Sequence, residues 1–231
     1  LGIEYIKALM RFNSKINPVP LKRLGAGYHS LDTGTKLASA TGIRTAMANK
    51  DNISGLLPDN CLNIIKNHTT IEYNDFSTVL GSKLLSMDTL DHIEGINQDL
   101  SNRIANNKYN FTDIETFIPM LQSKNYTYSA ISRALLHIIL DIKTDDIKEF
   151  VNNNYAMILG FTKKSGVLSE ISKSTKIPLV SKFATFYKEA DNNQRKMLDI
   201  NLKADNLYRM IYMNKTGETL PTEFQRQIII F

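Results

Sequence analysis

The residues best suited to chemistry lie between Ala38 and Met47, where small and hydroxylated side chains lead into a predicted helix. Ser39 and Thr41 are both suitable N-caps, because a side-chain oxygen can accept a hydrogen bond from the free N–H groups of a helix's first turn. We expect Arg44 in that first turn, where a cation is unfavourable beside the positive end of the helix dipole. A phosphate held between the helix start and the guanidinium would reverse the penalty. The alternative is an ordinary capped helix whose arginine points to solvent.

A glycine-containing segment precedes this motif and includes Gly25 and Gly27. Glycine lets the backbone approach a ligand closely, but it also serves simply to turn the chain. The segment is too short to be a phosphate-binding loop and has no Walker lysine. His29 ends the segment, where it could contact a ligand, stabilise the loop or face solvent.

No pattern in the sequence indicates hydrolytic or metal chemistry. Asp145 and Asp146 are expected to begin a helix, where acidic side chains complement the dipole. His137 lies in an apolar run and is expected to be a hydrogen-bonded core histidine. The single cysteine, Cys61, excludes an internal disulfide and a cysteine-based zinc cluster. We expect Cys61 to be buried in a protein of the reducing cytoplasm.

The charge balance favours polyanionic partners, since the 231 residues carry a formal net charge of +5. Tyr126 and Tyr128 lie close to Lys124 and Arg133, a mixture of aromatic and cationic groups that suits unstacked RNA bases. The tyrosines could equally be half-buried packing residues. A second basic stretch, which is either an RNA contact or a solvated face, contains Lys163, Lys164, Lys173, Lys176 and Lys182. No apolar run approaches the length of a membrane span.

Residues 1–50 are predicted to be the end of an α/β domain. Apolar residues at positions 1, 5, 9 and 12 share one face of a helix from Leu1 to Phe12. Leu21–Leu24 has the length of a strand end, and Tyr28–Lys36 is predicted to be a loop. The helix that follows Ser39 completes this domain.

Residues 51–231 are predicted to be mostly helical and to bind RNA. Two extended pieces, Tyr155–Phe161 and Pro178–Lys182, flank a helix and fit a small parallel strand pair, and the apolar C-terminal end is expected to dock against other elements. The expected helices are Pro58–Lys66, Asn74–Ser86, Asp88–Glu94, Asn97–Asn107, Asp113–Gln122, Thr127–Ile142, a short one marked by Thr144, Ile147 and Val151, then Gly166–Ser174 and Asp191–Met213.

Several segments together resemble the family of tRNA(Met) cytidine acetate ligases, which are ATP-dependent enzymes with a nucleotidyltransferase-like fold. The resemblance follows family patterns such as K-R-I-x-A-G-Y-H, S-A-T-x-I-R, K-R-Y-T and L-G-F-T-K-K, which occur here in the same order. The matching segments are Leu1–Tyr5, Lys22–His29, Ser39–Arg44, Lys124–Thr127 with Arg133 and His137, Leu159–Lys164, and Pro178–Val180.

The resemblance implies a mainly α fold, in which the remnant of a Rossmann-like nucleotidyltransferase α/β domain precedes a helical domain with a few short strands. It implies that acetate and ATP form acetyl-adenylate, and that the acetyl group passes to N4 of the wobble cytidine of elongator tRNA(Met). Arg23 would contact the nucleotide, while Ser39, Thr41 and Arg44 would hold the triphosphate. Residues expected to contact the RNA are Arg103, Lys124, Arg133, Lys163 and Lys164.

The sequence departs from the family in two respects. The H-x-G-H motif of the family's ATP site does not occur in these 231 residues. We therefore expect the chain to be the C-terminal part of a longer protein and to be inactive by itself. Asn125, Ala130 and Met157 stand where the family commonly has arginine, which weakens the predicted tRNA contacts. A non-catalytic RNA-binding helical module and a small-molecule adenylyltransferase remain as alternatives.

Overall fold

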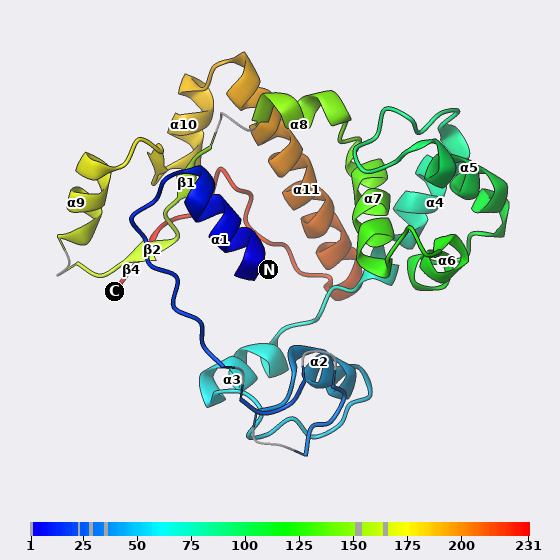
Figure 1. Cartoon of the computed structure of the whole chain (residues 1–231), viewed down its shortest axis with the longest axis horizontal. Coiled ribbons are helices and arrows are strands. Elements are labelled where there is room, and N and C mark those ends of the chain that lie inside the picture. The colour runs from blue at the N-terminus through cyan, green and yellow to red at the C-terminus, as the bar shows by residue number, and fades with distance from the viewer. Residues whose placement is uncertain (1, 23, 28–29, 35–36, 151–153, 164–165) are drawn as a thin grey trace. The chain divides into compact units, whose positions relative to one another are not determined.

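The computed structural model describes residues 2–22, 24–27, 30–34, 37–150, 154–163 and 166–231, without the side chains of residues 148 and 149. The chain is mainly helical (Figure 1) and folds as two compact units, Leu1–His68 and Thr69–Phe231. The boundary predicted after residue 50 lies before the observed division, because α3 (Asp59–Asn67) belongs to the first unit.

The described residues of the first unit contain α1 (Gly2–Arg11), α2 (Ala40–Ala48) and α3. The helix predicted at the start of the chain is confirmed as α1, yet none of its residues is buried. Ala46 of α2 and Leu62 of α3 are buried. The strand end predicted at Leu21–Leu24 is wrong for the described residues, because this extended segment has no neighbouring strand with which to pair.

The second unit joins a group of helices to two short strand pairs (Figure 1). α4 packs against α7, α6 packs against α5 and α7, and α11 packs against α7 and α8. The elements of this unit are η1 (Tyr73–Phe76), α4 (Ser77–Ser86), α5 (Gln98–Asn107), η2 (Lys108–Asn110), α6 (Ile114–Leu121), α7 (Tyr128–Leu140), α8 (Thr144–Phe150), β1 (Ala156–Met157), β2 (Gly160–Phe161), α9 (Val167–Ser174), β3 (Leu179–Val180), α10 (Phe183–Glu189), α11 (Asn192–Thr216) and β4 (Ile229–Ile230).

The main core of the second unit lies between α4, α5, α6 and α7. Each of these helices turns apolar side chains inward, so that Leu80, Ile104, Phe117 and Leu135 are almost completely buried in one cluster. Phe111 packs edge-on against Phe117, with ring centroids 5.1 Å apart and an angle of 83° between the planes. The apolar periodicity of the sequence therefore corresponds to a real core in this unit.

Polar side chains fix where three of these helices begin. Asn97 Oδ1 accepts a hydrogen bond from the Leu100 N–H at 3.0 Å, and Asp113 Oδ1 accepts one from the Thr116 N–H at 2.9 Å. Thr127 caps α7 in the same way. Because each cap replaces a missing intrahelical partner, the predicted starts of α5, α6 and α7 are confirmed.

The helix predicted over Asp88–Glu94 is wrong, since this segment forms turns that pair with the chain after α7. Ile93 and Lys143 form an isolated antiparallel bridge, and the Glu94 N–H donates to the carbonyl oxygen of Ile142 at 2.9 Å. These tertiary hydrogen bonds take the backbone groups that a helix would have used.

The parallel strand pair predicted from the two extended pieces is confirmed. β1 pairs in parallel with β3, and α9 forms the connection between them. β2 pairs in parallel with β4, so the apolar C-terminal end docks as expected. A Cβ atom at Gly160 would lie 2.8 Å from the carbonyl oxygen of Ile229. This close approach explains why glycine stands in β2.

The sequence did not indicate α10, which is held through contacts with α11. Arg195 of α11 donates from Nη2 to the carbonyl oxygens of Tyr187, Lys188 and Ala190 at 3.3–3.4 Å, and so closes the C-terminal end of α10. α11 itself spans 25 residues. Neither it nor another helix in the described part of the chain is long and apolar enough to cross a membrane.

Two adjacent leucines of α4 test the position of the core. Leu84 is 2% exposed and Leu85 is 61% exposed. Replacing Leu84 by alanine should lower the free energy of unfolding by about 2–5 kcal/mol, because it removes buried atoms and leaves a cavity. The matched change Leu85→Ala should cost less than about 0.5 kcal/mol. Urea denaturation followed by circular dichroism measures both, and equal losses would contradict the assigned core.

Candidate functional site

The glycine-containing segment and the start of α2 lie side by side, because the loop between them folds back. The Ala26 N–H donates to the carbonyl oxygen of Leu37 at 3.0 Å. The Ser39 hydroxyl donates to the carbonyl oxygen of Ser30 at 2.5 Å. The structure thus brings together two motifs that the sequence presents separately.

Two glycines permit this close approach. Gly25 has a φ of +82°, and a Cβ atom there would lie 2.6 Å from the carbonyl oxygen of Leu37. A Cβ atom at Gly42 would lie 3.1 Å from the carbonyl oxygen of Ser30. Residue types larger than glycine would therefore push the loop away from the N-terminus of α2.

Ser39 is the N-cap of α2 and is completely buried. Its Oγ accepts a hydrogen bond from the Gly42 N–H at 2.9 Å while its proton goes to Ser30. Both roles of the hydroxyl are used inside the fold. Ser39 therefore holds the helix start in place, and any contact with a ligand at this site must come from its neighbours.

The two residues after Ser39 have backbone N–H groups that are available to a ligand at the helix start. The N–H groups of Ala40 and Thr41 have no hydrogen-bond partner within the described residues. Thr41 is half-buried inside the helix and is not its cap. Two free N–H groups at the positive end of a helix dipole form a site that favours an anion.

Arg44 lies at the start of the second turn of α2, and not in the first turn as the sequence suggested. Because Ser39 and not Thr41 is the N-cap, Arg44 is the fifth helical residue and begins the second turn. Helical side chains slope toward the N-terminus, so a long side chain at this position can still extend over the first turn. The Arg44 side chain is exposed and forms no ion pair with the described residues. Its guanidinium is accessible to an external anion.

Two predicted residues of this site, Arg23 and His29, lie outside the described residues. Within the described part, no group of three or more histidine, cysteine, aspartate or glutamate side chains could hold a metal ion. His137 is half-buried, and its Nδ1 lies 2.7 Å from the carbonyl oxygen of Glu94. The prediction of a hydrogen-bonded core histidine is therefore confirmed.

The predicted RNA contacts are spread over the second unit. Lys124, in the turn before α7, and Arg133, on α7, are both exposed and form no ion pair with the described residues. Lys163 is exposed and follows β2 closely in the chain. Arg103 on α5 contacts Asp99 at 3.1 Å, which neutralises part of its charge. Lys164 lies outside the described residues.

The two tyrosines near Lys124 differ in their environment. Tyr126 packs against the main core, and its hydroxyl donates to Asn97 Oδ1 at 2.6 Å, so it is a packing residue. Tyr128 is 41% exposed. Partial burial raises the pKa of Tyr128, and the nearby Glu115 carboxylate raises it further. Tyr128 is thus a partly exposed aromatic ring with a carboxylate nearby.

Sequence reasoning missed a group of lysines that meet around Lys203 of α11. Its Nζ donates to the carbonyl oxygen of Leu140 at 2.6 Å. Burial lowers the pKa of Lys203, and the positive charges of Lys83 and Lys143 lower it further, against an opposing effect of Asp141. A hollow of about 290 Å³ beside it is lined by three lysines and three aspartates, so its charge is balanced. The sequence gives no local pattern that would predict this group, because Lys83 lies on α4, Lys143 precedes α8 and Lys203 lies on α11.

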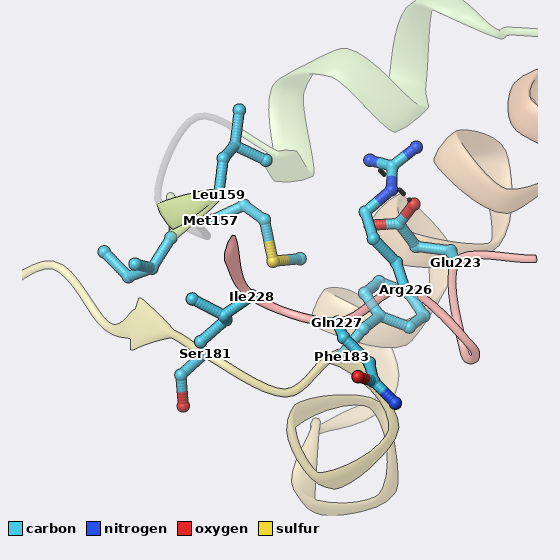
Figure 2. A pocket seen from close by; sticks show the side chains of 9 residues that line it. Met157, Leu159, Ser181, Phe183, Glu223, Arg226, Gln227 and Ile228 are labelled. Atoms are coloured by element: carbon cyan, nitrogen blue, oxygen red, sulfur yellow. Dashed lines mark ion pairs between the residues drawn. The ribbon is translucent and has the colours of Figure 1, made fainter. Parts of the chain in front are cut away.

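A second hollow, drawn in Figure 2, lies between the β1–β2 segment, the chain after β3 and the C-terminal segment. Its volume of about 20 Å³ holds about one water molecule. Arg226 Nη1 and Glu223 Oε2 form an ion pair there at 3.1 Å, drawn as a dashed line. This hollow is too small for a nucleotide or a base.

Removing the Ser39 hydroxyl tests its holding role. In Ser39→Ala the carbonyl of Ser30 and the N–H of Gly42 lose their partner, and the free energy of local opening at α2 should fall by about 1–3 kcal/mol. Amide hydrogen exchange of α2 measures this. Thr45→Ala, at an exposed position of the same helix, is the control and should leave exchange nearly unchanged. Unaltered α2 protection in Ser39→Ala would refute the role.

Known proteins resemble the chain over nearly its whole length. It is 31% identical over 224 residues to the tRNA(Met) cytidine acetate ligase of Thermoanaerobacter sp. strain X514, covering 94% of this chain and 55% of the relative. It is 34% identical over 222 residues to the enzyme of that name from Caldanaerobacter subterraneus, covering 93% of this chain and 55% of the relative. The chain thus spans a little over half the length of these relatives.

The fold also matches solved structures. Thermotoga maritima TmcAL, in its apo form I crystal structure, superposes with a TM-score of 0.86 at 22% identity, over all of this chain and 59% of that one. The same protein bound with alpha-thio ATP superposes with a TM-score of 0.84. The profile of the family described as HIGH Nucleotidyl Transferase matches residues 1–222. The motif resemblance is thereby confirmed, and the chain belongs to the HIGH nucleotidyl transferase family.

Proposed function

We propose that the protein is an ATP-dependent ligase that joins acetate to a cytidine of tRNA(Met). The observation that carries the proposal is the exposed Arg44, free of ion pairs with the described residues, beside two open N–H groups at the start of α2. This helix start carries the S-A-T-x-I-R motif, and relatives about 30% identical bear the name tRNA(Met) cytidine acetate ligase. The related Thermotoga structure contains an ATP analogue.

The proposed reaction has two steps. An oxygen of acetate attacks the α-phosphorus of ATP, and pyrophosphate leaves with the electron pair of the broken P–O bond, which gives acetyl-adenylate. The N4 amine of the wobble cytidine of elongator tRNA(Met) then attacks the acetyl carbonyl carbon. AMP leaves, the amine loses a proton, and N4-acetylcytidine results. Both steps depend mainly on positioning and on neutralising phosphate charge.

In this mechanism the first unit binds the triphosphate. The N–H groups of Ala40 and Thr41 would donate to phosphate oxygens, and the Thr41 hydroxyl offers one more donor. The Arg44 guanidinium would neutralise charge on the leaving pyrophosphate. Ser39 would act by holding the helix start, and Arg23 would contact the nucleotide.

The second unit would bind the tRNA. Lys124 and Arg133 offer free positive charge on either side of the start of α7, and Tyr128 offers an exposed ring to an unstacked base. Arg103 would contribute less, because Asp99 competes for its guanidinium. Lys163 and Lys164 would make a separate contact near β2. Phosphate contacts of this kind make affinity depend on salt.

A non-catalytic RNA-binding module is the second candidate. It is favoured by the self-contained core beneath the cations of the second unit. A small-molecule adenylyltransferase would use the same helix start without needing a basic second unit. ATP binding and tRNA binding, measured separately, distinguish the three.

The ATP assignment predicts a defect in Arg44→Ala. Loss of charge-assisted hydrogen bonds should raise the Kd for ATP by about 10- to 100-fold, which corresponds to about 1.4–2.8 kcal/mol. Lys50→Ala removes an exposed cation just beyond the other end of α2 and should leave the Kd within about twofold. Isothermal titration calorimetry measures both. An Arg44→Ala protein that binds ATP like the unchanged protein would exclude this phosphate site.

The tRNA assignment predicts a change in salt dependence. In the double variant Lys124→Ala, Arg133→Ala, the plot of log affinity against log salt should become shallower by about 0.7–0.9 for each phosphate that the protein no longer neutralises. Lys7→Ala in α1 removes an exposed cation from the other unit and should not alter the slope. Filter binding with tRNA(Met) over a series of salt concentrations provides the measurement. Binding that salt does not weaken would contradict the assignment, whereas tRNA binding without ATP binding would favour the RNA-binding module.

A further inference from the structure

Lys203 of α11 holds its amine against the end of another helix. Its Nζ donates to the carbonyl oxygen of Leu140, the last residue of α7, at 2.6 Å. Lysine side chains often bind the last carbonyl groups of a helix, and the hydrogen bond fixes where the amine lies. The residue as a whole is exposed and lines a hollow at the surface, so small molecules in solution reach its side chain.

The surroundings of this amine favour its neutral form. Burial of the amine against α7 lowers the pKa of Lys203. The positive charges of Lys83 on α4 and Lys143 before α8 lower this pKa further, while the Asp141 carboxylate opposes them. Lys203 forms no ion pair with the described residues that would hold its proton. A lysine amine that has lost its proton is a nucleophile, whereas an ammonium group is not.

The hollow beside the amine has room for a small reactant. Its volume of about 290 Å³ is close to the lower limit for small-molecule sites. Lys143 offers a cation to a phosphate group there. Asp146 accepts a hydrogen bond from the Lys143 N–H, and Asp199 accepts one from the Tyr187 hydroxyl, so both carboxylates are engaged inside the fold. The charged residues that line the hollow are Asp141, Lys143, Asp146, Lys196, Asp199 and Lys203.

We propose that Lys203 is an acetylation site whose acetyl donor is a small acyl phosphate, such as acetyl phosphate or acetyl-adenylate. The lone pair of Nζ attacks the acetyl carbonyl carbon, so that an N–C bond forms and the C–O bond to the phosphate breaks. Phosphate or AMP leaves with the electron pair of that bond, and the nitrogen loses a proton to water. The product is a neutral amide that keeps one N–H for Leu140. The inference goes beyond the proposed function, in which no residue of the protein is acetylated.

The test treats the purified 231-residue chain with acetyl phosphate at neutral pH and follows each lysine by peptide mass spectrometry. Lys203 should react at least about threefold faster than Lys124, which is exposed and forms no ion pair with the described residues. Lys215 should react more slowly than both, because Asp75 holds its ammonium group at 2.8 Å. In concentrated urea the three rates should converge, since unfolding removes these surroundings.

Two charge variants separate the effect of the surroundings from simple accessibility. Lys83→Gln removes a positive charge that lowers the pKa of Lys203 and should slow acetylation there about two- to threefold. Asp141→Asn removes the opposing negative charge and should speed it by about the same factor. Asparagine tolerates the left-handed backbone of position 141, where φ is +56°. Lys66→Gln, at an exposed position of the first unit, is the matched control and should leave the rate nearly unchanged.

Either of two results would overturn the proposal. One is acetylation of Lys203 no faster than that of Lys124 in the folded chain. The other is a Lys203 rate that Lys83→Gln and Asp141→Asn leave equal, which would reduce the effect to accessibility. Because acetyl phosphate is supplied from outside, neither result depends on ATP binding. Normal ATP affinity in Arg44→Ala would refute the proposed phosphate site and leave the acetylation of Lys203 standing.

Discussion

The start of α2 depends on one buried hydroxyl. A serine side chain removed from water must satisfy both its proton and its lone pairs inside the protein. Ser39 does so by donating to Ser30 and accepting from Gly42. This arrangement ties the preceding loop to the helix and sets which residue is the first of α2. The geometry of the proposed anion site follows from that register, including the N–H groups of Ala40 and Thr41 that have no partner within the described residues.

The register also explains how Arg44 can serve the site from the second turn. Had Thr41 been the cap, the guanidinium would stand within the first turn, where the helix dipole opposes it most strongly. Placed two residues further into the helix, at the start of the second turn, the arginine costs less in the free protein and still extends toward the helix start. The close packing of Gly42 against Ser30 completes the arrangement. The proposed anion site thus consists of backbone donors that the fold holds in place and one exposed cation.

The helices of the second unit were largely predictable, because their signals are local. Asn97, Asp113 and Thr127 cap helices whose apolar residues repeat at helical spacing. Asp88–Glu94 shows the limit of such reasoning, since its helical pattern lost to hydrogen bonds with Ile142 and the chain beyond it. α10 went unpredicted for a related reason, as Arg195 of another helix completes its C-terminal end.

The sequence by itself determined the starts of α5, α6 and α7, the small parallel strand pair and the family motifs, and it left Ser39 and Thr41 as the two candidate caps of α2. Those features depend on residues a few positions apart, whose interactions are encoded in spacing and side-chain type. Only the tertiary structure decided that Ser39 faces inward while Arg44 remains exposed, that Gly160 lies against Ile229, and that three lysines meet at Lys203. These outcomes depend on which distant segments pack together, because burial and charge are properties of the space around a residue and not of its neighbours in the chain.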